Sequence, residues 1–393
     1  MRTTVQHQEG AALASTLPEW LREQARRGPH AVALRHKRLG VWRTWTWQAV
    51  AAQVEQLAAG LAQRGFVAGD LLILLSEPRD EALLLSLAAQ WGGGVALPLD
   101  PELAERDLQN VLRQRAPRFA FASDDAQIDR LLAYSQQVID ANPRGLPVHP
   151  DAAVIDYRTL GLAREGGFAP LAKPYDDAFA FVRVDREDGA EGAGVLVEQR
   201  LTHATLVQEA QHLARVEKLQ PHDEALAARA FAAAAQARYL IAPWLLTGFR
   251  LNFPESLATC DNDRRELAPT LVAGTRETYA RVARLVDARL PGAASLRRKL
   301  IRRAQQAHSG PLTRALTWWL ITRPLREVIG FARTDAALVA GSPLDDDTAA
   351  LFRALRVDVH AWPDSGDWRR VPDEAPLLCA TPSRHDGQLG QPA

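Results

Sequence analysis

The chain has 393 residues, of which 47% are hydrophobic and 24% charged, the balance of a soluble globular protein. Lys+Arg and Asp+Glu are equal at 47 each, which excludes a chain-wide basic field for nucleic acid. The two cysteines, Cys260 and Cys379, exclude a disulfide scaffold and a four-cysteine metal site, and they favour a cytoplasmic location. No apolar run reaches the roughly 18 residues that span a bilayer. The amino terminus lacks a signal-peptide layout, so export is not expected.

The first third of the chain alternates helix and strand patterns. Apolar residues at helical spacing over 48–64 predict a helix that Gly65 ends. The continuous apolar run Leu71–Leu75 predicts a strand buried on both faces. The elements expected next are a helix opened by Pro78 and ended at Gly92, a strand over Val95–Leu99, a helix begun by Asp100 and Pro101, and a strand over Arg118–Ala122. This β-α-β-α-β order predicts an α/β fold with a parallel sheet and right-handed crossovers.

The second part begins with a connector over 141–176, rich in Pro and Gly, in which Ala153–Tyr157 has a strand-like pattern. The residues 223–240 are so rich in Ala that helix and strand both remain open. The other elements expected are strands over Ala178–Val184 and Val195–Val197, helices over 202–218, 275–290 and 294–331, and an irregular stretch over the final 25 residues.

Several segments carry a family resemblance. Residues 16–132 include TLPEWLREQARRGPHAVALRHKRLGVWRTWTW and AAGLAQRGFVAGDLLILLSEPRDEALLLSLAAQWGGGVALPLDP. The later segments are LNFPES (251–256), ELAPTLVAGTRETYARV (266–282), SLRRKLIRRA (295–304) and RPLREVIGFARTDAALVAGSPLDDDTAALFRALRV (323–357). In these segments the chain resembles the adenylate-forming (AMP-binding) superfamily, and within it the long-chain acyl-CoA synthetases. The resemblance implies a large α/β domain of mixed sheets and flanking helices over 17–393. A flexible terminus over 1–16 would precede it, and its subdomains would cover about 17–175 and 176–393.

The segment at the family's phosphate loop departs from the family pattern. That pattern is Y-T-S-G-T-T-G-x-P-K-G after a D-D-x-A-F-I strand, and here the strand survives over 176–182. Gly189 and Gly194 persist as a remnant of the phosphate loop, but the lysine is gone and Val184, Asp185, Glu187 and Asp188 replace the hydroxyl residues. Residues 183–191 carry two Arg and four acids, a net charge of −2. Ionised carboxylates donate no hydrogen bonds, so this loop disfavours a polyphosphate. An acidic cluster that holds Mg²⁺ against a nucleotide stays open as an alternative.

The family's second chemical element is an aromatic-Gly-x-Thr-Glu sequence whose Thr and Glu serve adenylate and Mg²⁺. Here residues 360–367 read HAWPDSGD and contain no Thr-Glu pair. Asp364, or else Asp367, is the candidate substitute for the Glu as a metal ligand. Family members also continue for well over a hundred residues, in a mobile lid with a lysine, beyond the point matched by 387–393. The expected fold is therefore the large domain without its lid.

The function expected from these departures is a degenerate long-chain acyl-CoA synthetase homologue without independent ATP-dependent ligase activity, in which a fatty acyl ligand or a regulatory role is retained. ATP, Mg²⁺ and CoA are implied by the resemblance alone. One alternative is a functional or partner-completed fatty acyl-CoA ligase. Another is a peripheral membrane adaptor, because 295–331 combines arginines with Leu312, Leu316, Trp319, Leu320 and Leu325. The sequence predicts no nucleic-acid partner and does not give the oligomeric state.

Three further patterns have simpler structural interpretations. No G-x-S-x-G elbow is present, which argues against a hydrolytic triad. His203 and His212 lack other ligand residues at metal-binding spacing, so surface or helix-capping roles are expected. The aromatic group Trp42, Trp45 and Trp47 is expected to pack in the core.

Overall fold

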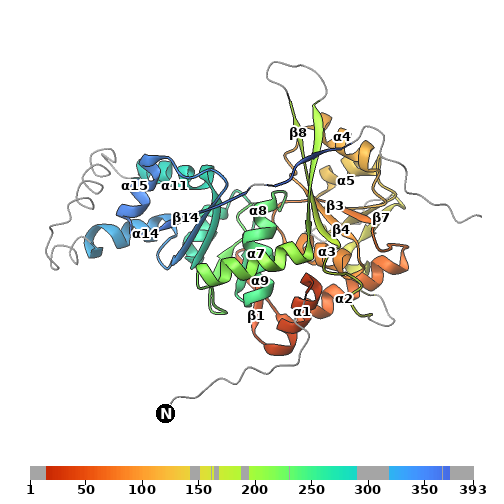
Figure 1. Cartoon of the computed structure of the whole chain (residues 1–393), viewed down its shortest axis with the longest axis horizontal. Helices are drawn as coiled ribbons and strands as arrows, with labels where there is room; N and C mark the ends of the chain where they lie inside the picture. The colour runs from red at the N-terminus through yellow and green to blue at the C-terminus, as the bar shows by residue number, and fades with distance from the viewer. Residues whose placement is uncertain are drawn as a thin grey trace, which may run out of the picture.

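The computed structural model describes residues 15–141, 151–160, 162, 168–186, 194–229, 231–289, 318–364 and 366–371. These residues form two β-sheets with helices packed around them (Figure 1). The architecture is the α/β fold of mixed sheets and flanking helices that the sequence predicts. The predicted connector 141–176 supplies β7 and α6 in its described part, and the final 22 residues lie outside the described ranges.

The first sheet has eight strands among the described residues, in the order β15-β9-β8-β4-β3-β5-β6-β7. Its strands are β3 (Leu71–Leu75), β4 (Val95–Leu99), β5 (Phe119–Ala122), β6 (Gln137–Asp140), β7 (Val154–Asp156), β8 (Asp177–Asp185), β9 (Val195–Thr202) and β15 (Arg369–Arg370). β3 pairs in parallel with both β4 and β5, which confirms the predicted β-α-β-α-β unit. The apolar run of β3 is almost wholly buried because helices cover both faces.

The second sheet has seven strands among the described residues, in the order β14-β13-β12-β10-β11-β1-β2. They are β1 (Val32–Arg38), β2 (Val41–Thr46), β10 (Glu224–Leu226), β11 (Arg250–Phe253), β12 (Leu271–Thr275), β13 (Ala336–Ala340) and β14 (Val359–Trp362). All neighbours pair in parallel except the β1–β2 hairpin. Each sheet draws strands from both sides of residue 175, so the sheets do not follow the predicted division there.

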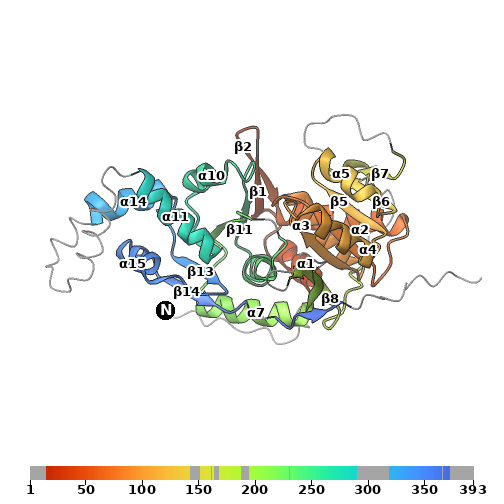
Figure 2. The same ribbon diagram turned by 90° about the horizontal axis from the view of Figure 1, so that it is seen from above.

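Helices cover both sheets and fill the space between them (Figure 2). They are α1 (Leu17–Arg27), α2 (Trp47–Gln63), α3 (Asp80–Trp91), α4 (Glu105–Arg115), α5 (Asp125–Leu132), α6 (Tyr157–Leu160), α7 (His203–Val216), α8 (Ala234–Gln236), the π-helix η1 (Ala237–Ile241), α9 (Ala242–Thr247), α10 (Cys260–Leu267), α11 (Arg276–Arg289), the π-helix η2 (Trp318–Thr322), α14 (Arg323–Ile329) and α15 (Asp346–Ala354). The Ala-rich stretch 223–240 therefore contains both a strand, β10, and helical turns.

The largest core cluster joins the two sheets through α1, α2, α3, α7 and α9. Trp244 is fully buried there and stacks on Trp47 with ring centroids 4.8 Å apart. Its indole N–H donates a 3.0 Å hydrogen bond to the Ala33 carbonyl, which satisfies the polar atom of this large side chain. Burial of the expected tryptophan group is graded: Trp47 is buried, whereas Trp45 and Trp42 are half-buried.

Two predicted helix starts are wrong. The helix assigned to Pro78 begins at Asp80, after Arg79. The helix assigned to Asp100 and Pro101 begins at Glu105. Asp100 instead accepts a 2.9 Å hydrogen bond from the Glu102 N–H, so its side chain stabilises a local turn rather than the first turn of a helix.

The first described helix, α1, is capped by Thr16, which is fully buried. Its hydroxyl accepts a hydrogen bond from the Glu19 N–H, and the Glu19 carboxylate accepts one from the Thr16 N–H. This reciprocal capping box was not predicted, although the S/T-x-x-E pattern is present in the sequence.

Candidate active site region

The carboxyl ends of parallel strands mark where α/β proteins bind ligands. A cavity of about 170 Å³ lies at such a position, between the end of β4 and the segment that follows β10. Its lining residues are Pro98, Leu99, Asp100, Leu103, Val182, Arg229, Ala232 and Ala233. Six of these eight side chains are apolar. The volume is below the roughly 300–1,000 Å³ of pockets that enclose drug-sized ligands. This cavity suits a short apolar group and is too small for a nucleoside triphosphate.

Polar groups at the strand ends connect one side of the cavity to the second sheet. Arg229 donates a 2.8 Å hydrogen bond to the Thr275 hydroxyl at the end of β12. The Thr275 hydroxyl donates in turn to Glu277, at 2.7 Å. This hydrogen bond holds the pKa of Glu277 below its usual range. Arg229 is therefore linked to a carboxylate through one hydroxyl rather than left without a partner.

The β8–β9 hairpin stands where the sequence places the phosphate loop. Gly189 lies outside the described residues, whereas Gly194 immediately precedes β9. A Cβ on Gly194 would come within 2.4 Å of Val184 Cγ1 across the hairpin. Close packing against β8 therefore accounts for this glycine without any phosphate. Strand β9 also extends to Thr202, well beyond the expected Val197.

Charges near the loop end of this hairpin are already paired. Arg183 forms an ion pair with Asp185, with Nε and Oδ1 2.8 Å apart. Arg186 forms one with Asp107 on α4. Residues 177–201 contain no Ser, Thr or Lys. Both guanidinium groups thus bond to protein carboxylates, and the sequence offers no hydroxyl or ammonium donor to a triphosphate.

The segment after β14 crosses from the second sheet to the first, as the dark blue trace in Figure 1 shows. It ends in β15, which pairs antiparallel with β9 through Arg369 and Arg370. The Tyr239 hydroxyl donates to the Pro363 carbonyl, and the Trp362 indole N–H donates to Glu217 at 2.9 Å. We call residues 362–371, which run from the last residue of β14 through β15, the crossover segment.

Asp364, the sequence candidate for a metal ligand, lies on the crossover segment and its side chain is exposed. No set of three ligand side chains in the described part of the chain includes Asp364. A Cβ on Gly366 would meet the Gln199 amide at 1.9 Å, so this stretch lies directly on β9. The residues of the β8–β9 hairpin and the exposed Asp364 therefore do not fit ATP and Mg²⁺.

Arg238 on η1 lies close to Asp364 and to Glu209 on α7. Its Nε is 3.4 Å from Glu209 Oε2. Burial raises the pKa of Glu209, and the Arg238 guanidinium opposes that rise. Burial also raises the pKa of the Tyr239 hydroxyl, to about 12. These polar residues lie where α7, η1 and the crossover segment meet.

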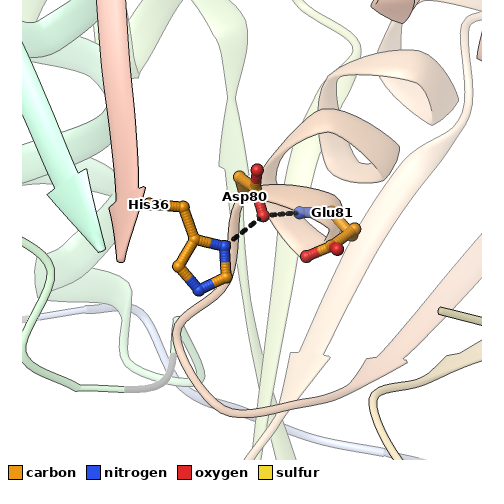
Figure 3. A group of neighbouring side chains, drawn as sticks. All are labelled: His36, Asp80 and Glu81. Atoms are coloured by element: carbon orange, nitrogen blue, oxygen red, sulfur yellow. Dashed lines mark hydrogen bonds and ion pairs between the residues drawn. The ribbon is translucent and has the colours of Figure 1, made fainter. Parts of the chain in front are cut away.

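Sequence reasoning missed a buried group formed by His36, Asp80 and Glu81 (Figure 3). Potential ligand atoms of the three side chains lie within 4.8 Å of one another. His36 on β1 contacts Asp80 through Nδ1 and Oδ1, 2.7 Å apart, and the Glu81 N–H donates to the same oxygen at 3.1 Å. His36 and Asp80 are 44 positions apart in the sequence and form no local motif, because only the packing of β1 against α3 brings them together.

Protein cations already balance this buried group. Arg38 donates to Asp80 at 3.0 Å and also to Glu81, and Arg79 contacts Glu81 at 3.3 Å. Burial alone would raise the pKa of Asp80, but the hydrogen bonds from His36 and Glu81 hold it well below its usual range. Burial and the adjacent Asp80 raise the pKa of Glu81. Two guanidinium groups disfavour an added cation, so we assign the group to an internal ion-pair network between the two sheets.

The remaining sequence candidates take structural positions. His203 is fully buried rather than on the surface, and its Nδ1 accepts a 3.3 Å hydrogen bond from the Leu17 N–H at the start of α1. Burial lowers the pKa of His203 to about 4. The His212 ring contacts the Trp362 ring edge to face. Cys260 is buried, which raises the pKa of its thiol to about 11, and Cys379 lies outside the described ranges.

The proposed membrane region 295–331 is described only from residue 318 onward, so Leu312 and Leu316 lie outside the description. Trp319 and Leu320 are 61% and 68% exposed, whereas Leu325 is buried. Arg323 lies over the Trp319 ring at 4.7 Å and pairs with Glu327 at 3.1 Å. None of the described helices combines the length and apolarity needed to cross a membrane.

Comparison with known families shows what the N-terminal part of the chain is similar to. Residues 21–159 match the family described as AMP-binding enzyme. The similarity to this family is confined to these residues, which are less than half of the chain. The chain is 27% identical to tyrocidine synthase 3 of Brevibacillus parabrevis over 192 residues, which are 49% of this chain and 3% of that protein. It is 34% identical to protein Y of Streptomyces griseus over 102 residues, 26% of this chain and 32% of that protein. The chain thus spans less than two thirds of either relative.

Solved structures extend the similarity of fold to most of the chain. MatB of Rhodopseudomonas palustris superimposes with a TM-score of 0.63 at 16% identity, covering 89% of this chain and 59% of that one. The N-terminal subdomain of Klebsiella oxytoca NpsA gives 0.61 at 17% identity, covering 89% and 72%. A fatty acyl-adenylate ligase of L. pneumophila, solved with acyl adenylate and pyrophosphate, gives 0.61 at 12%, covering 88% and 53%. At these identities the likeness shows the fold of the large domain of adenylate-forming enzymes.

Proposed function

We propose that this chain is a degenerate acyl-CoA synthetase homologue that does not catalyse ATP-dependent ligation by itself. One observation carries the proposal: the β8–β9 hairpin presents carboxylates where the family offers phosphate donors. Asp185 holds Arg183, and Asp107 holds Arg186. A triphosphate at this hairpin would have to displace these carboxylates or lie beside them, and it would find no hydroxyl or ammonium group in 177–201.

The crossover segment supports the same conclusion independently. The Trp362 indole N–H donates to Glu217, and the Pro363 carbonyl accepts from Tyr239. Gly366 packs closely on the Gln199 amide. These contacts tie the segment to α7, η1 and β9. The Thr and Glu that serve adenylate and Mg²⁺ in the family are absent from this segment. The residues present in their place make packing contacts with other elements of the fold.

The ligand that we propose for the retained cavity is a short acyl group or the end of a fatty acyl chain. Leu99, Leu103 and Val182 supply apolar walls, and Arg229 supplies a cation at the rim. A cavity of about 170 Å³ fits only a few methylene groups. We therefore expect weak binding, with an affinity that stops increasing once the acyl chain exceeds a few carbons.

ATP–pyrophosphate exchange with a panel of fatty acids of increasing length tests the lack of ligase activity. The proposal expects no exchange above the rate without protein. Robust exchange by the purified full chain would support the alternative, a functional fatty acyl-CoA ligase. Exchange that requires an added protein would support a partner-completed ligase.

A second candidate function is association with a membrane surface through 295–331. Its support is the exposure of Trp319 and Leu320 beside Arg323, because aromatic and basic groups together favour the headgroup region. Sedimentation with anionic liposomes would test it, with Trp319→Asp as the variant that should stay in solution. Equal sedimentation of both proteins would count against this candidate.

A further inference from the structure

Three arginines converge on one carboxylate in the second sheet, near the amino ends of its central strands β10 and β11. Glu224 is the first residue of β10 and is buried. It contacts Arg250 on β11 and Arg333 before β13 directly, and Arg35 on β1 through Nη2 at 3.5 Å. We call these four residues the arginine cluster. It combines side chains from four segments that are far apart in the sequence.

The register of the sheet brings these side chains to one face. Glu224 is paired with Arg250 across the β10–β11 ladder, and Arg35 is paired with Asn252 across β1–β11. Neighbouring residues in register project on the same face of a sheet. Arg333 is fixed from the loop side by hydrogen bonds to the Ala268 and Leu267 carbonyls, both at 3.0 Å. The cluster is therefore positioned by backbone geometry and not by chance contact of surface side chains.

The charges of the arginine cluster do not balance. Three guanidinium groups meet one carboxylate, which leaves a net charge of +2. Neighbouring Asp223 accepts hydrogen bonds from the Thr270 hydroxyl and the Gln220 N–H, and in the described ranges no ion pair joins it to these arginines. Burial first, and then repulsion from Arg250 and Arg333, lower the pKa of Arg35, and Glu224 opposes this effect. An anion bound at the cluster would relieve the repulsion.

Solvent reaches the three arginines of the cluster more readily than it reaches the carboxylate. The side chains of Arg35, Arg250 and Arg333 are 24%, 28% and 53% exposed, whereas that of Glu224 is 6% exposed. The carboxylate thus forms the floor and the guanidinium groups form the rim. Guanidinium groups offer planar pairs of N–H donors that match the oxygens of phosphate.

We propose that the arginine cluster binds a compact oxyanion of the phosphate class, at a site separate from the cavity and from the β8–β9 hairpin. The ligand is a doubly charged group such as inorganic phosphate or the terminal phosphate of a monoester. The cluster lies at the amino ends of β10, β11 and β13, whereas the cavity follows the carboxyl ends of β4 and β10. The proposal does not depend on the proposed function.

The test is a calorimetric titration of the full chain with inorganic phosphate, with chloride at equal ionic strength as the reference. Wild-type protein should bind phosphate saturably. Arg250→Gln should weaken binding about tenfold or more, because it removes a charged hydrogen-bond donor. Glu224→Gln should tighten binding, because it raises the net charge of the cluster. A parallel titration with glycerol phosphate shows whether the site binds a phosphate monoester more tightly than free phosphate.

The two substitutions move binding in opposite directions, which separates an anion site from a purely structural ion-pair network. A network of that kind predicts no saturable binding in wild-type protein, and this result would overturn the proposal. Arg369→Gln, which removes an exposed arginine elsewhere, is the matched control and should leave binding unchanged. If Glu224→Gln fails to fold, Arg35→Gln should give the same loss as Arg250→Gln. Binding lost in Arg229→Gln but kept in Arg250→Gln would place the anion at the cavity and also overturn the proposal.

Discussion

Two regions of the molecule are stabilised by different kinds of contact. One is the scaffold around β3, and the other is formed by the β8–β9 hairpin and the crossover segment. β3, β4 and β5 are built from buried apolar side chains, and α3 between them is buried along its whole length. The hairpin and crossover segment depend on ion pairs such as Arg183–Asp185, on the hydrogen bond from Trp362 to Glu217, and on the close packing of Gly366. The two regions are thus stabilised by different sets of residues: apolar burial forms the scaffold around β3, whereas polar contacts and close packing position the hairpin and the crossover segment.

The largest effect should come from the shared core. Trp244→Ala removes a fully buried ring that stacks on Trp47 and leaves the Ala33 carbonyl without its partner. We expect it to lower the free energy of unfolding by about 3–5 kcal/mol. Chemical denaturation would measure the change. Trp319→Ala is the matched control, because that ring is 61% exposed and its loss should cost less than about 0.5 kcal/mol. Equal losses in both variants would contradict the core assignment.

Acidification should weaken the contact between α1 and α7. The pKa of His203 is lowered to about 4 in the folded chain by burial, despite the carboxylates of Asp176 and Glu19. In the unfolded chain the imidazole takes up its proton near pH 6.5, well before the folded chain does as the pH falls. Stability should therefore fall by about 2 kcal/mol between pH 6.5 and pH 5.

Denaturation curves of wild type and His203→Gln across that pH range would measure this effect. The variant has no imidazole to protonate and its amide oxygen can still accept from the Leu17 N–H. Its stability should therefore change less with pH than that of the wild type. Parallel pH dependences would show that His203 does not govern the loss.

A smaller effect is expected in the crossover segment. Gly366→Ala would place a methyl group 1.9 Å from the buried Gln199 amide, so either β15 or Gln199 must move. We expect a cost of about 1–3 kcal/mol, together with faster hydrogen exchange in β9 where β15 covers it. Gly92→Ala serves as the control, since the nearest atom to its Cβ is 3.5 Å away. Unchanged exchange in β9 would mean that Gly366 does not hold the crossover segment in place.

The smallest effect is expected at the cap of α1. Thr16→Ala removes the hydroxyl that accepts from the Glu19 N–H at the start of α1. The loss should be about 1 kcal/mol, and Thr16→Ser should recover most of it because serine keeps the hydroxyl. Thermal unfolding of the three proteins measures this difference. A serine variant as unstable as the alanine variant would argue for methyl packing instead of capping.

The sequence predicts the scaffold well because its signals are local. Leu71–Leu75 and Val95–Leu99 are short apolar runs between helix patterns, and such runs have few alternatives to a buried parallel strand. The helix start predicted at Asp100 is wrong because an aspartate side chain accepts a backbone N–H in a turn as it does at a helix cap, so the sequence does not distinguish the two.

The candidate site is less predictable because its partners are distant in the chain. Arg186 finds Asp107 on α4, and β15 pairs with β9 across more than 160 residues of intervening chain. The motif predicts a phosphate-binding role for Gly194, yet its close approach to Val184 accounts for a glycine at this position. The buried contact of His36 with Asp80 likewise has no sequence spacing that would reveal it.

A calorimetric titration with ATP, with and without Mg²⁺, tests the central claim most directly. It should be run on the wild type and on Arg250→Gln, so that any phosphate bound at the arginine cluster is recognised by its loss in the variant. We predict no saturable nucleotide binding to Arg250→Gln in either condition, because the β8–β9 hairpin offers carboxylates in place of donors. Saturable Mg²⁺-dependent ATP binding that persists in this variant would contradict the account.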